Sequence, residues 1–298
     1  MNVDRLLLTE QVNTASRGID GRSTVEILEI ISSEDRKVAG AVAVEIHHIV
    51  QAVDRIVEAI RKGGRLFYIG AGTSGRLGVL DATECPPTFQ APPELVQAVI
   101  AGGDRAVSRA TEASEDDPEA GRHDLLARQF MAKDALVGIA ASGRTPYVLR
   151  AVSAAKDLGA LTIGIACTPD SELSRLVEIA IVPLTGAEVI AGSTRMKAGT
   201  ATKLVLNMIS TAVMIRLGYV YGNLMVNVQP SNSKLEDRAK RIIMESASVT
   251  YERAGELLRA AGGNVRVAIV MARLSVDRAS AEARLDAAGG RIAEALGI

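Results

Sequence analysis

The sequence predicts an α/β protein: a parallel sheet flanked by helices, with a helical arm before it and a small helical subdomain after it. Three observations lead to this prediction. Short, almost uninterrupted apolar runs alternate with stretches of helical periodicity, a pattern typical of parallel strands buried on both faces. Loops rich in glycine and hydroxyl residues follow two of these runs. After about residue 235 the chain is rich in Ala, Arg and Glu and has no strand pattern.

The elements follow from periodicity and from the residues that interrupt it. Residues 24–62 carry apolar side chains at helical spacing, and Gly63 and Gly64 end that pattern. The period then changes, and five apolar runs predict strands at residues 65–69, 96–100, 135–141, 161–166 and 178–184.

Helices are predicted between and after the strands. A helix over 77–83 is expected to stop before Pro86 and Pro87, because proline lacks the amide donor and clashes with the preceding turn. A long helix is predicted over 196–217, and three or four shorter ones after residue 235. We therefore divide the chain into an N-terminal helical arm (1–55), an α/β domain (56–222) and a C-terminal helical subdomain (223–298).

Length and composition limit the classes of protein. With 298 residues, 48% hydrophobic and 23% charged, the chain is globular and long enough for one large domain with an appendage. The net charge of −1 provides no basic field for nucleic acid or an anionic membrane. Aromatic residues make up 3% and Trp is absent, so a base-stacking surface is hard to build. We expect neither nucleic acid nor membrane as a partner.

The cysteines and the apolar stretches predict a soluble, cytoplasmic protein. Cys85 and Cys167 form neither a disulfide framework nor a zinc spacing, and each is expected to be a small core residue. The apolar run at 6–8 is too short for a signal sequence. The most apolar later stretch, 204–217, is shorter than the ~20 residues that span a bilayer.

Three loops concentrate glycine and hydroxyl side chains: residues 72–75, 142–145 and 192–195. The first two directly follow apolar strands, and ligands of open α/β sheets bind beyond the carboxyl ends of the strands. Glycine lets the backbone approach an anion, and helix N-termini direct N–H groups at it. The loops therefore predict a phosphate cradle, the alternative being ordinary turns and helix caps.

The first loop also has the G-x-G-x-x-G spacing of dinucleotide-binding proteins, at Gly70, Gly72 and Gly75. That motif requires an acidic residue at the end of the next strand, about 20 residues on. Asp104 lies 34 residues after Gly70, which disfavours NAD. Hydroxyls inside the loop suit a terminal phosphate better.

Acid–base chemistry falls to carboxylates or lysines, because the sequence has 3 His and no metal-binding spacing. Glu84, directly before the proline stop, is expected to be fixed and partly buried, where burial favours the protonated form that a general acid needs. An acidic run follows the second strand, and the sequence alone does not single out one of its members: Glu112, Glu115, Asp116, Asp117 and Glu119.

Three segments make the sequence similar to a known family. Residues 66–89 read LFYIGAGTSGRLGVLDATECPPTF, residues 138–148 read GIAASGRTPYV, and residues 192–222 continue the similarity. They closely resemble the N-acetylmuramic acid 6-phosphate etherase family, of the sugar isomerase (SIS) fold group, over nearly the whole chain. Thr83 stands where serine is usual and Asn227 where aspartate is expected. Neither residue is assigned chemistry.

The resemblance implies a cytoplasmic carbon–oxygen lyase of cell-wall amino-sugar recycling. Such an enzyme cleaves the D-lactyl ether of N-acetylmuramic acid 6-phosphate to N-acetylglucosamine 6-phosphate and D-lactate. The family is understood to work by elimination and hydration: a base removes the C2 proton of the opened sugar, lactate leaves from C3, and water adds. This chemistry requires no metal or redox cofactor, so none is expected. The fold group also implies a homodimer.

Residue roles carry over by position. Glu84 matches the family's proton donor to lactate, and Glu115 matches the second acidic residue, the expected C2 base. The 6-phosphate and nearby hydroxyls are assigned to Thr73, Ser74, Ser142, Gly143, Thr145 and Ser193. Lys197 and Lys234 are either anion partners or ordinary surface or helix-dipole lysines.

Two other functions are compatible with this fold. A non-catalytic sugar-phosphate sensor, such as a kinase regulator, needs the phosphate loops but not the pair Glu84 and Glu115. An aldose–ketose isomerase shares C2 proton removal but releases no acid. Release of lactate therefore distinguishes the etherase from both.

Overall fold

The computed structural model describes residues 8–109 and 114–298, and the chain forms two compact units. The first comprises the residues up to Thr83 together with Glu94–Ser210 and contains the main sheet. The second comprises Glu84–Pro93 and Thr211–Ile298 and contains the C-terminal helices. The three-part division into 1–55, 56–222 and 223–298 stays a prediction.

Short turns and three helices precede the sheet: η1 (Leu8–Glu10), η2 (Thr14–Ser16), η3 (Ile19–Gly21), α1 (Thr24–Asp35), α2 (Val38–Val44) and α3 (Ile46–Arg61). A capping box formed by Ser23 and Glu26 starts α1. The sequence predicts one helical pattern over 24–62, whereas the structure interrupts it after α1 and again at Glu45. At the second break the Glu45 carboxylate turns inward and accepts a hydrogen bond from the backbone N–H of Val182 at 3.0 Å.

Five parallel strands form one sheet in the order β2-β1-β3-β4-β5. They are β1 (Leu66–Gly70), β2 (Val96–Ile100), β3 (Ala135–Ile139), β4 (Leu161–Ile165) and β5 (Ile179–Ile181). The predicted parallel sheet is confirmed, although β5 is shorter than the expected 178–184. The strand order reverses between the neighbours β1 and β3, and ligands of open α/β sheets bind at such a switch point.

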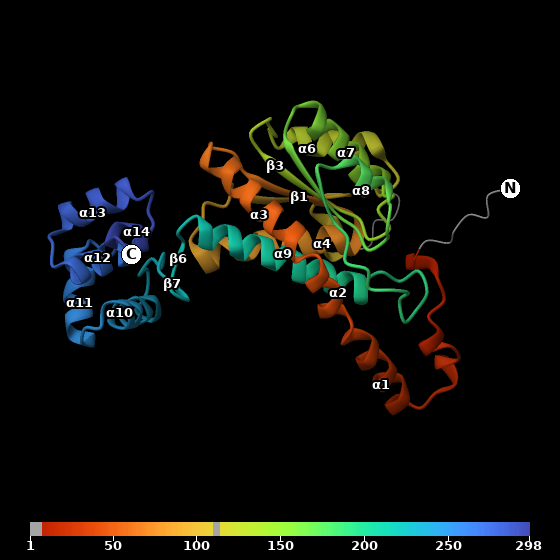
Figure 1. Ribbon diagram of the computed structural model, residues 1–298, viewed down its shortest axis with the longest axis horizontal. Coiled ribbons are helices and arrows are strands. Elements are labelled where there is room, and N and C mark those ends of the chain that lie inside the picture. Colours follow the sequence, from red (N-terminus) through yellow and green to blue (C-terminus); the bar gives the residue numbers. More distant parts are fainter. Residues whose placement is uncertain (1–7, 110–113) are drawn as a thin grey trace. The chain divides into compact units, whose positions relative to one another are not determined.

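Helices cover both faces of this sheet (Figure 1). The elements are α4 (Gly72–Phe89), α5 (Arg105–Ser108), α6 (Pro118–Ala127), α7 (Pro146–Asp157), α8 (Glu172–Leu176) and α9 (Lys197–Arg216). The alternation of side chains along β1 decides which helix each face meets. Phe67 and Ile69 belong to a buried cluster with Val148 of α7. On the other face, the Tyr68 hydroxyl donates to Asp81 of α4 at 2.9 Å.

The helix after β1 does not stop before the prolines, contrary to the sequence prediction. It runs from Gly72 to Phe89 with Pro86 and Pro87 inside it. Each proline removes the hydrogen bond to the carbonyl four residues earlier, but the neighbouring residues keep their own donors. The helix therefore continues to Phe89.

The helix predicted over 196–217 is observed as α9, which extends beyond the apolar stretch that begins at residue 204. It has 20 residues and is, by length and composition alone, apolar enough to cross a membrane. More than half of its most apolar window is buried within the structure, and Val205, Leu206 and Ile209 are fully buried. This burial is typical of a core helix in a soluble protein.

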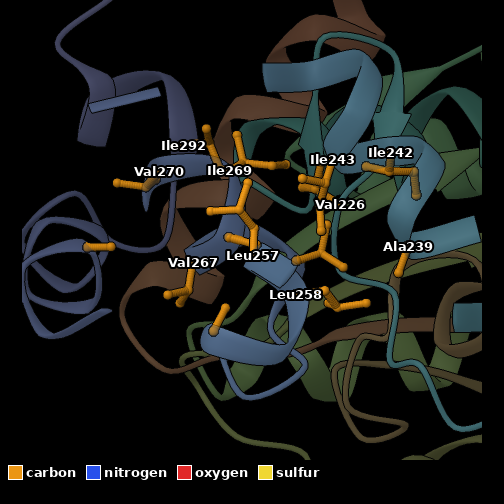
Figure 2. Packing of buried hydrophobic residues seen from close by; sticks show 14 of the residues in the cluster. Val226, Ala239, Ile242, Ile243, Leu257, Leu258, Val267, Ile269, Val270 and Ile292 are labelled. Atoms are coloured by element: carbon orange, nitrogen blue, oxygen red, sulfur yellow. The ribbon is translucent and has the colours of Figure 1, made fainter. Parts of the chain in front are cut away.

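The second unit has its own hydrophobic core. Its elements are β6 (Val220–Tyr221), β7 (Leu224–Met225), α10 (Ser233–Ala247), α11 (Tyr251–Ala260), α12 (Val265–Leu274), α13 (Arg278–Ala287) and α14 (Ile292–Leu296). The sequence predicts three or four of these helices and the structure has five. Ile243 of α10, Leu257 of α11, Ile269 of α12 and Ile292 of α14 meet in the centre (Figure 2).

Candidate functional site

The loop between β1 and α4 brings a helix N-terminus to the switch point of the sheet. A Cβ on Gly75 would lie 2.6 Å from the carbonyl oxygen of Gly70, so glycine at this position lets α4 begin directly against β1. Thr73 and Ser74 are half-buried in the first turn of α4. The first N–H groups of a helix have no intrahelical acceptors, and such a helix end suits an anion.

The loop between β3 and α7 lies on the other side of the switch point. Gly143 has a φ of +68°, and its N–H donates to the carbonyl of Ala140 at 2.8 Å. A Cβ at this glycine would lie 2.3 Å from the Cβ and Oγ of Ser171. The half-buried Ser142 accepts a hydrogen bond from the backbone N–H of Arg144 at 3.3 Å. Glycine is therefore required for the shape of this loop.

Replacing Gly143 by alanine is expected to lower the free energy of unfolding by about 2–3 kcal/mol, because the new methyl group clashes with Ser171 at a positive φ. Urea denaturation measures this loss. The matched control is Gly103→Ala: Gly103 also has a positive φ, of +65°, but a Cβ there meets nothing within 4 Å. We expect the control to lose about 1 kcal/mol. Equal losses in the two variants would contradict the role of Ser171.

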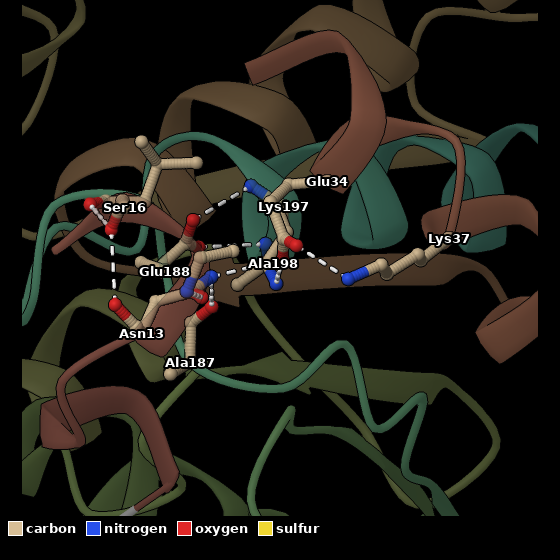
Figure 3. Close-up of polar contacts among 10 residues, drawn as sticks. Asn13, Ser16, Glu34, Lys37, Ala187, Glu188, Lys197 and Ala198 are labelled. Carbon is tan, nitrogen blue, oxygen red and sulfur yellow. Dashed lines mark hydrogen bonds and ion pairs between the residues drawn. The ribbon is translucent and has the colours of Figure 1, made fainter. Parts of the chain in front are cut away.

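The third loop precedes α9, whose N-terminus is already occupied by a carboxylate. Glu188 accepts hydrogen bonds from the backbone N–H groups of Lys197 at 3.0 Å and Ala198 at 2.9 Å (Figure 3). Because this carboxylate fills the anion position of the helix end, the N–H groups of Lys197 and Ala198 are not available to another anion. The N–H of Ser193 donates to the carbonyl of Ile190 at 3.0 Å. The backbone N–H of Ser193 is therefore engaged, and its hydroxyl is the group that remains to contact a ligand.

The N-terminus of α7 is also engaged by an oxygen of the protein. The backbone N–H of Tyr147 donates to the carbonyl of Glu115 at 3.2 Å, and Pro146 has no N–H to offer. At the start of α9, a Cβ on Gly199 would lie 3.5 Å from the Cγ2 of Thr73. The structure thus places the start of α9 against the first loop. At the starts of α7 and α9, protein oxygens already accept hydrogen bonds from the backbone N–H groups.

Among the described members of the acidic run, Glu115 has a side chain that contacts the loop between β3 and α7. Its half-buried carboxylate accepts a hydrogen bond from the hydroxyl of Thr145 at 2.9 Å. Asp117 instead caps α6, accepting from the N–H of Ala120, and Glu119 pairs with Arg150 at the surface. Asp116 is exposed, and Glu112 falls outside the described residues.

Glu84 is exposed in its unit, and the expectation of a partly buried carboxylate is wrong. It belongs to the second unit, whereas Ser74 belongs to the first. Asp81 and Cys85 take the buried side of this helix, whereas Thr83 and Glu84 take the solvent side. Pro86 and Pro87 do not end the helix after Glu84, because α4 continues through them. Glu84 therefore stays on the solvent side of a regular helix.

Lys197 is neither a surface lysine nor available to an anion. Its ammonium is 2.6 Å from Oε2 of Glu34, and both side chains are almost fully buried (Figure 3). The same carboxylate accepts from Asn13 at 2.9 Å and pairs with Lys37. The N-terminal arm is thereby tied to the start of α9. Lys234 is exposed in the first turn of α10.

The sequence did not reveal two buried carboxylates that organise the region. Asp81 accepts hydrogen bonds from the side chains of Tyr68 at 2.9 Å, Asn207 at 2.6 Å and Ser210 at 3.0 Å, which joins β1, α4 and α9. Glu188 caps the N-terminus of α9. A carboxylate inside an apolar stretch was the available signal in both cases, since a buried charge requires partners.

Both cysteines are free and buried, as predicted. Burial, together with the nearby charge of Glu188, raises the pKa of the Cys167 thiol to about 12. The thiol therefore stays protonated at neutral pH, and Cys167 is a core residue rather than a nucleophile.

The fold and the site define the class of protein: an α/β protein with an anion-suited helix start at the switch point of its sheet. Residues 48–156 match the family model described as the glucokinase regulatory protein N-terminal SIS domain. A solved phosphoheptose isomerase from Neisseria gonorrhoeae is 19% identical, with a TM-score of 0.49, and the match covers 63% of this chain and 96% of that one.

Closer relatives match nearly the whole chain. A protein named N-acetylmuramic acid 6-phosphate etherase from Glaesserella parasuis is 53% identical over 96% of this chain and 94% of its own length. One of the same name from Clostridioides difficile is 51% identical over 97% of this chain and 95% of its own. The chain belongs to the N-acetylmuramic acid 6-phosphate etherase family.

Proposed function

We propose that this protein is a carbon–oxygen lyase that cleaves the D-lactyl ether of N-acetylmuramic acid 6-phosphate in cell-wall amino-sugar recycling. Its relatives of that name match it over nearly the full length of both chains. One structural observation carries the proposal: the Glu115 carboxylate is bonded to Thr145 in the loop after β3, at the switch point where a ligand binds.

The reaction needs one base and one acid. In the opened sugar the C2 proton is acidic because it is α to the aldehyde, and Glu115 removes it. Lactate leaves from C3 while Glu84 protonates its oxygen. Water then adds its hydroxyl at C3, and a proton returns to C2. The products are N-acetylglucosamine 6-phosphate and D-lactate, with no change of oxidation state that would need a redox cofactor.

The 6-phosphate binds, in this proposal, at the start of α4, beside Thr73 and Ser74. Internal oxygens already satisfy the starts of α7 and α9, which leaves the α4 terminus as the helix end for an anion. Ser142, Gly143 and Ser193 complete the phosphate site from the other two loops. Thr145, predicted as a further phosphate contact, donates its hydroxyl proton to Glu115.

Incubation with N-acetylmuramic acid 6-phosphate, followed by enzymatic measurement of D-lactate, tests the function. We expect one D-lactate and one N-acetylglucosamine 6-phosphate for each substrate consumed. Binding of the sugar without lactate would instead identify a sensor, and formation of a ketose without lactate would identify an isomerase. Either result contradicts the etherase.

We also propose that the protein is a cytoplasmic homodimer. Four apolar side chains on the N-terminal helices are more than half exposed: Val25, Leu28, Val44 and Val50. Exposed apolar side chains on three successive helices are candidates for a subunit contact. Light scattering after gel filtration is expected to give twice the chain mass of 31.3 kDa, and a mass of one chain would contradict the dimer.

The free, buried cysteines fit a reducing compartment.

A further inference from the structure

The hydroxyl of Thr145 does not cap the helix that this residue begins. It is the N-cap residue of α7, where threonine commonly accepts a hydrogen bond from the first turn, yet it makes no side-chain cap. Its hydroxyl instead donates to Oε1 of Glu115 at 2.9 Å. Thr145 is 6% exposed and Glu115 is half-buried, so the donor side of the bond is shielded from water.

The Thr145 hydroxyl can donate only one hydrogen bond at a time. A threonine hydroxyl has one proton to donate, and here it goes to the Glu115 carboxylate. A phosphate dianion presents acceptors only. While Thr145 holds Glu115, it therefore has no hydroxyl proton for the 6-phosphate.

The backbone around Glu115 is held as well. Its carbonyl accepts from the N–H of Tyr147 at 3.2 Å. The hydroxyl of Tyr147 in turn donates to Asp124 of α6 at 2.7 Å. A Cβ on Gly121 would lie 2.0 Å from the Tyr147 carbonyl oxygen, so α6 and α7 pack too closely here for any residue larger than glycine. Glu115 is thus fixed through both its main chain and one carboxylate oxygen.

We propose that Thr145 is a positioning residue for the base, a role that rests on the proposed etherase function. Its hydroxyl holds Oε1 of Glu115 and directs Oε2 toward C2 of the substrate. Within the described chain no residue hydrogen-bonds Oε2, so this oxygen is available to take the proton. Loss of the hydroxyl then slows proton removal rather than weakening phosphate binding.

The test compares Thr145→Val, which keeps the shape and removes the hydroxyl, with Thr145→Ser, which keeps the hydroxyl. For the valine variant we expect kcat to fall about 10–100-fold with KM changed less than about threefold, because a displaced base loses its alignment. With substrate deuterated at C2, the isotope effect on kcat/KM should rise, since proton removal becomes the slow step. The serine variant should recover most of kcat.

Ser142→Ala serves as the reference for a lost phosphate contact, with KM raised and the isotope effect unchanged. If Thr145→Val behaves like Ser142→Ala, Thr145 is a phosphate residue and the inference is wrong. If the valine variant does not fold, Thr145→Ala replaces it, with the folded fraction measured by circular dichroism. Absence of lactate with the unaltered protein would overturn the proposed function itself, and is thereby distinguished from failure of this inference.

Discussion

Replacing Glu84 by glutamine is expected to lower the rate of D-lactate release by about 10²–10⁴-fold. The amide has the shape of the carboxyl group but gives no proton to the departing lactate oxygen. The matched control is Glu94→Gln, an exposed carboxylate outside the three loops, which should leave the rate unchanged. Near-normal turnover of the Glu84 variant, with unchanged circular dichroism, would exclude Glu84 as the acid.

Exchange of the C2 hydrogen with deuterated water distinguishes the roles of the two carboxylates. Glu84→Gln retains the base, so hydrogen at C2 of the recovered substrate should still exchange with solvent. Glu115→Gln removes the base, and both exchange and lactate release should be lost. If the two variants lost exchange equally, the division of acid and base between Glu84 and Glu115 would be incorrect.

Replacing Lys197 by methionine is expected to lower the free energy of unfolding by about 3–5 kcal/mol, because the buried carboxylate of Glu34 then loses its buried cation. The pair is almost fully buried, with the ammonium 2.6 Å from the carboxylate. It also joins the arm to the start of α9 across 163 residues of sequence. Urea denaturation followed by circular dichroism measures the loss.

Two controls separate the buried pair from a general effect of charge. Lys37, the outer partner of Glu34, has a side chain that is 60% exposed, so Lys37→Met should cost less than about 1 kcal/mol. The double variant Glu34→Leu with Lys197→Met removes both buried charges and should recover most of the stability. A double variant as unstable as Lys197→Met alone would contradict this explanation.

The same contact predicts how stability depends on pH. Burial raises the pKa of the Glu34 carboxyl, but hydrogen bonds from Lys197, Lys37 and Asn13 outweigh burial and lower the pKa from 4.5 to about 2. A lowered pKa in the folded state contributes stability above pH 4.5, and that contribution is lost as the pH falls from 4.5 toward about 2. Glu34→Gln should lose this part of the acid dependence.

Local sequence patterns were sufficient to predict the strands of the sheet and the loops at its edge. The run 96–100 predicts β2 at its observed bounds, and the other runs give the remaining strands, because short, mainly apolar runs are typical of strands in a parallel sheet. The glycines of the first two loops were also visible, since a strand followed by glycine and hydroxyl residues marks a ligand-binding turn. The proline pair was misleading, because α4 tolerates Pro86 and Pro87 in its last turns.

The chain by itself determined the α/β class, the parallel strands and the residues of the three loops, since these depend on spacing within a few residues. Tertiary structure alone decided which helix start remains for an anion, because Glu188 caps α9 and the Glu115 carbonyl meets α7. It also paired Lys197 with Glu34 and Thr145 with Glu115. Each of these contacts satisfies a polar group that folding removes from water, and the partner that satisfies it is set by the packing of distant elements, which no local pattern records.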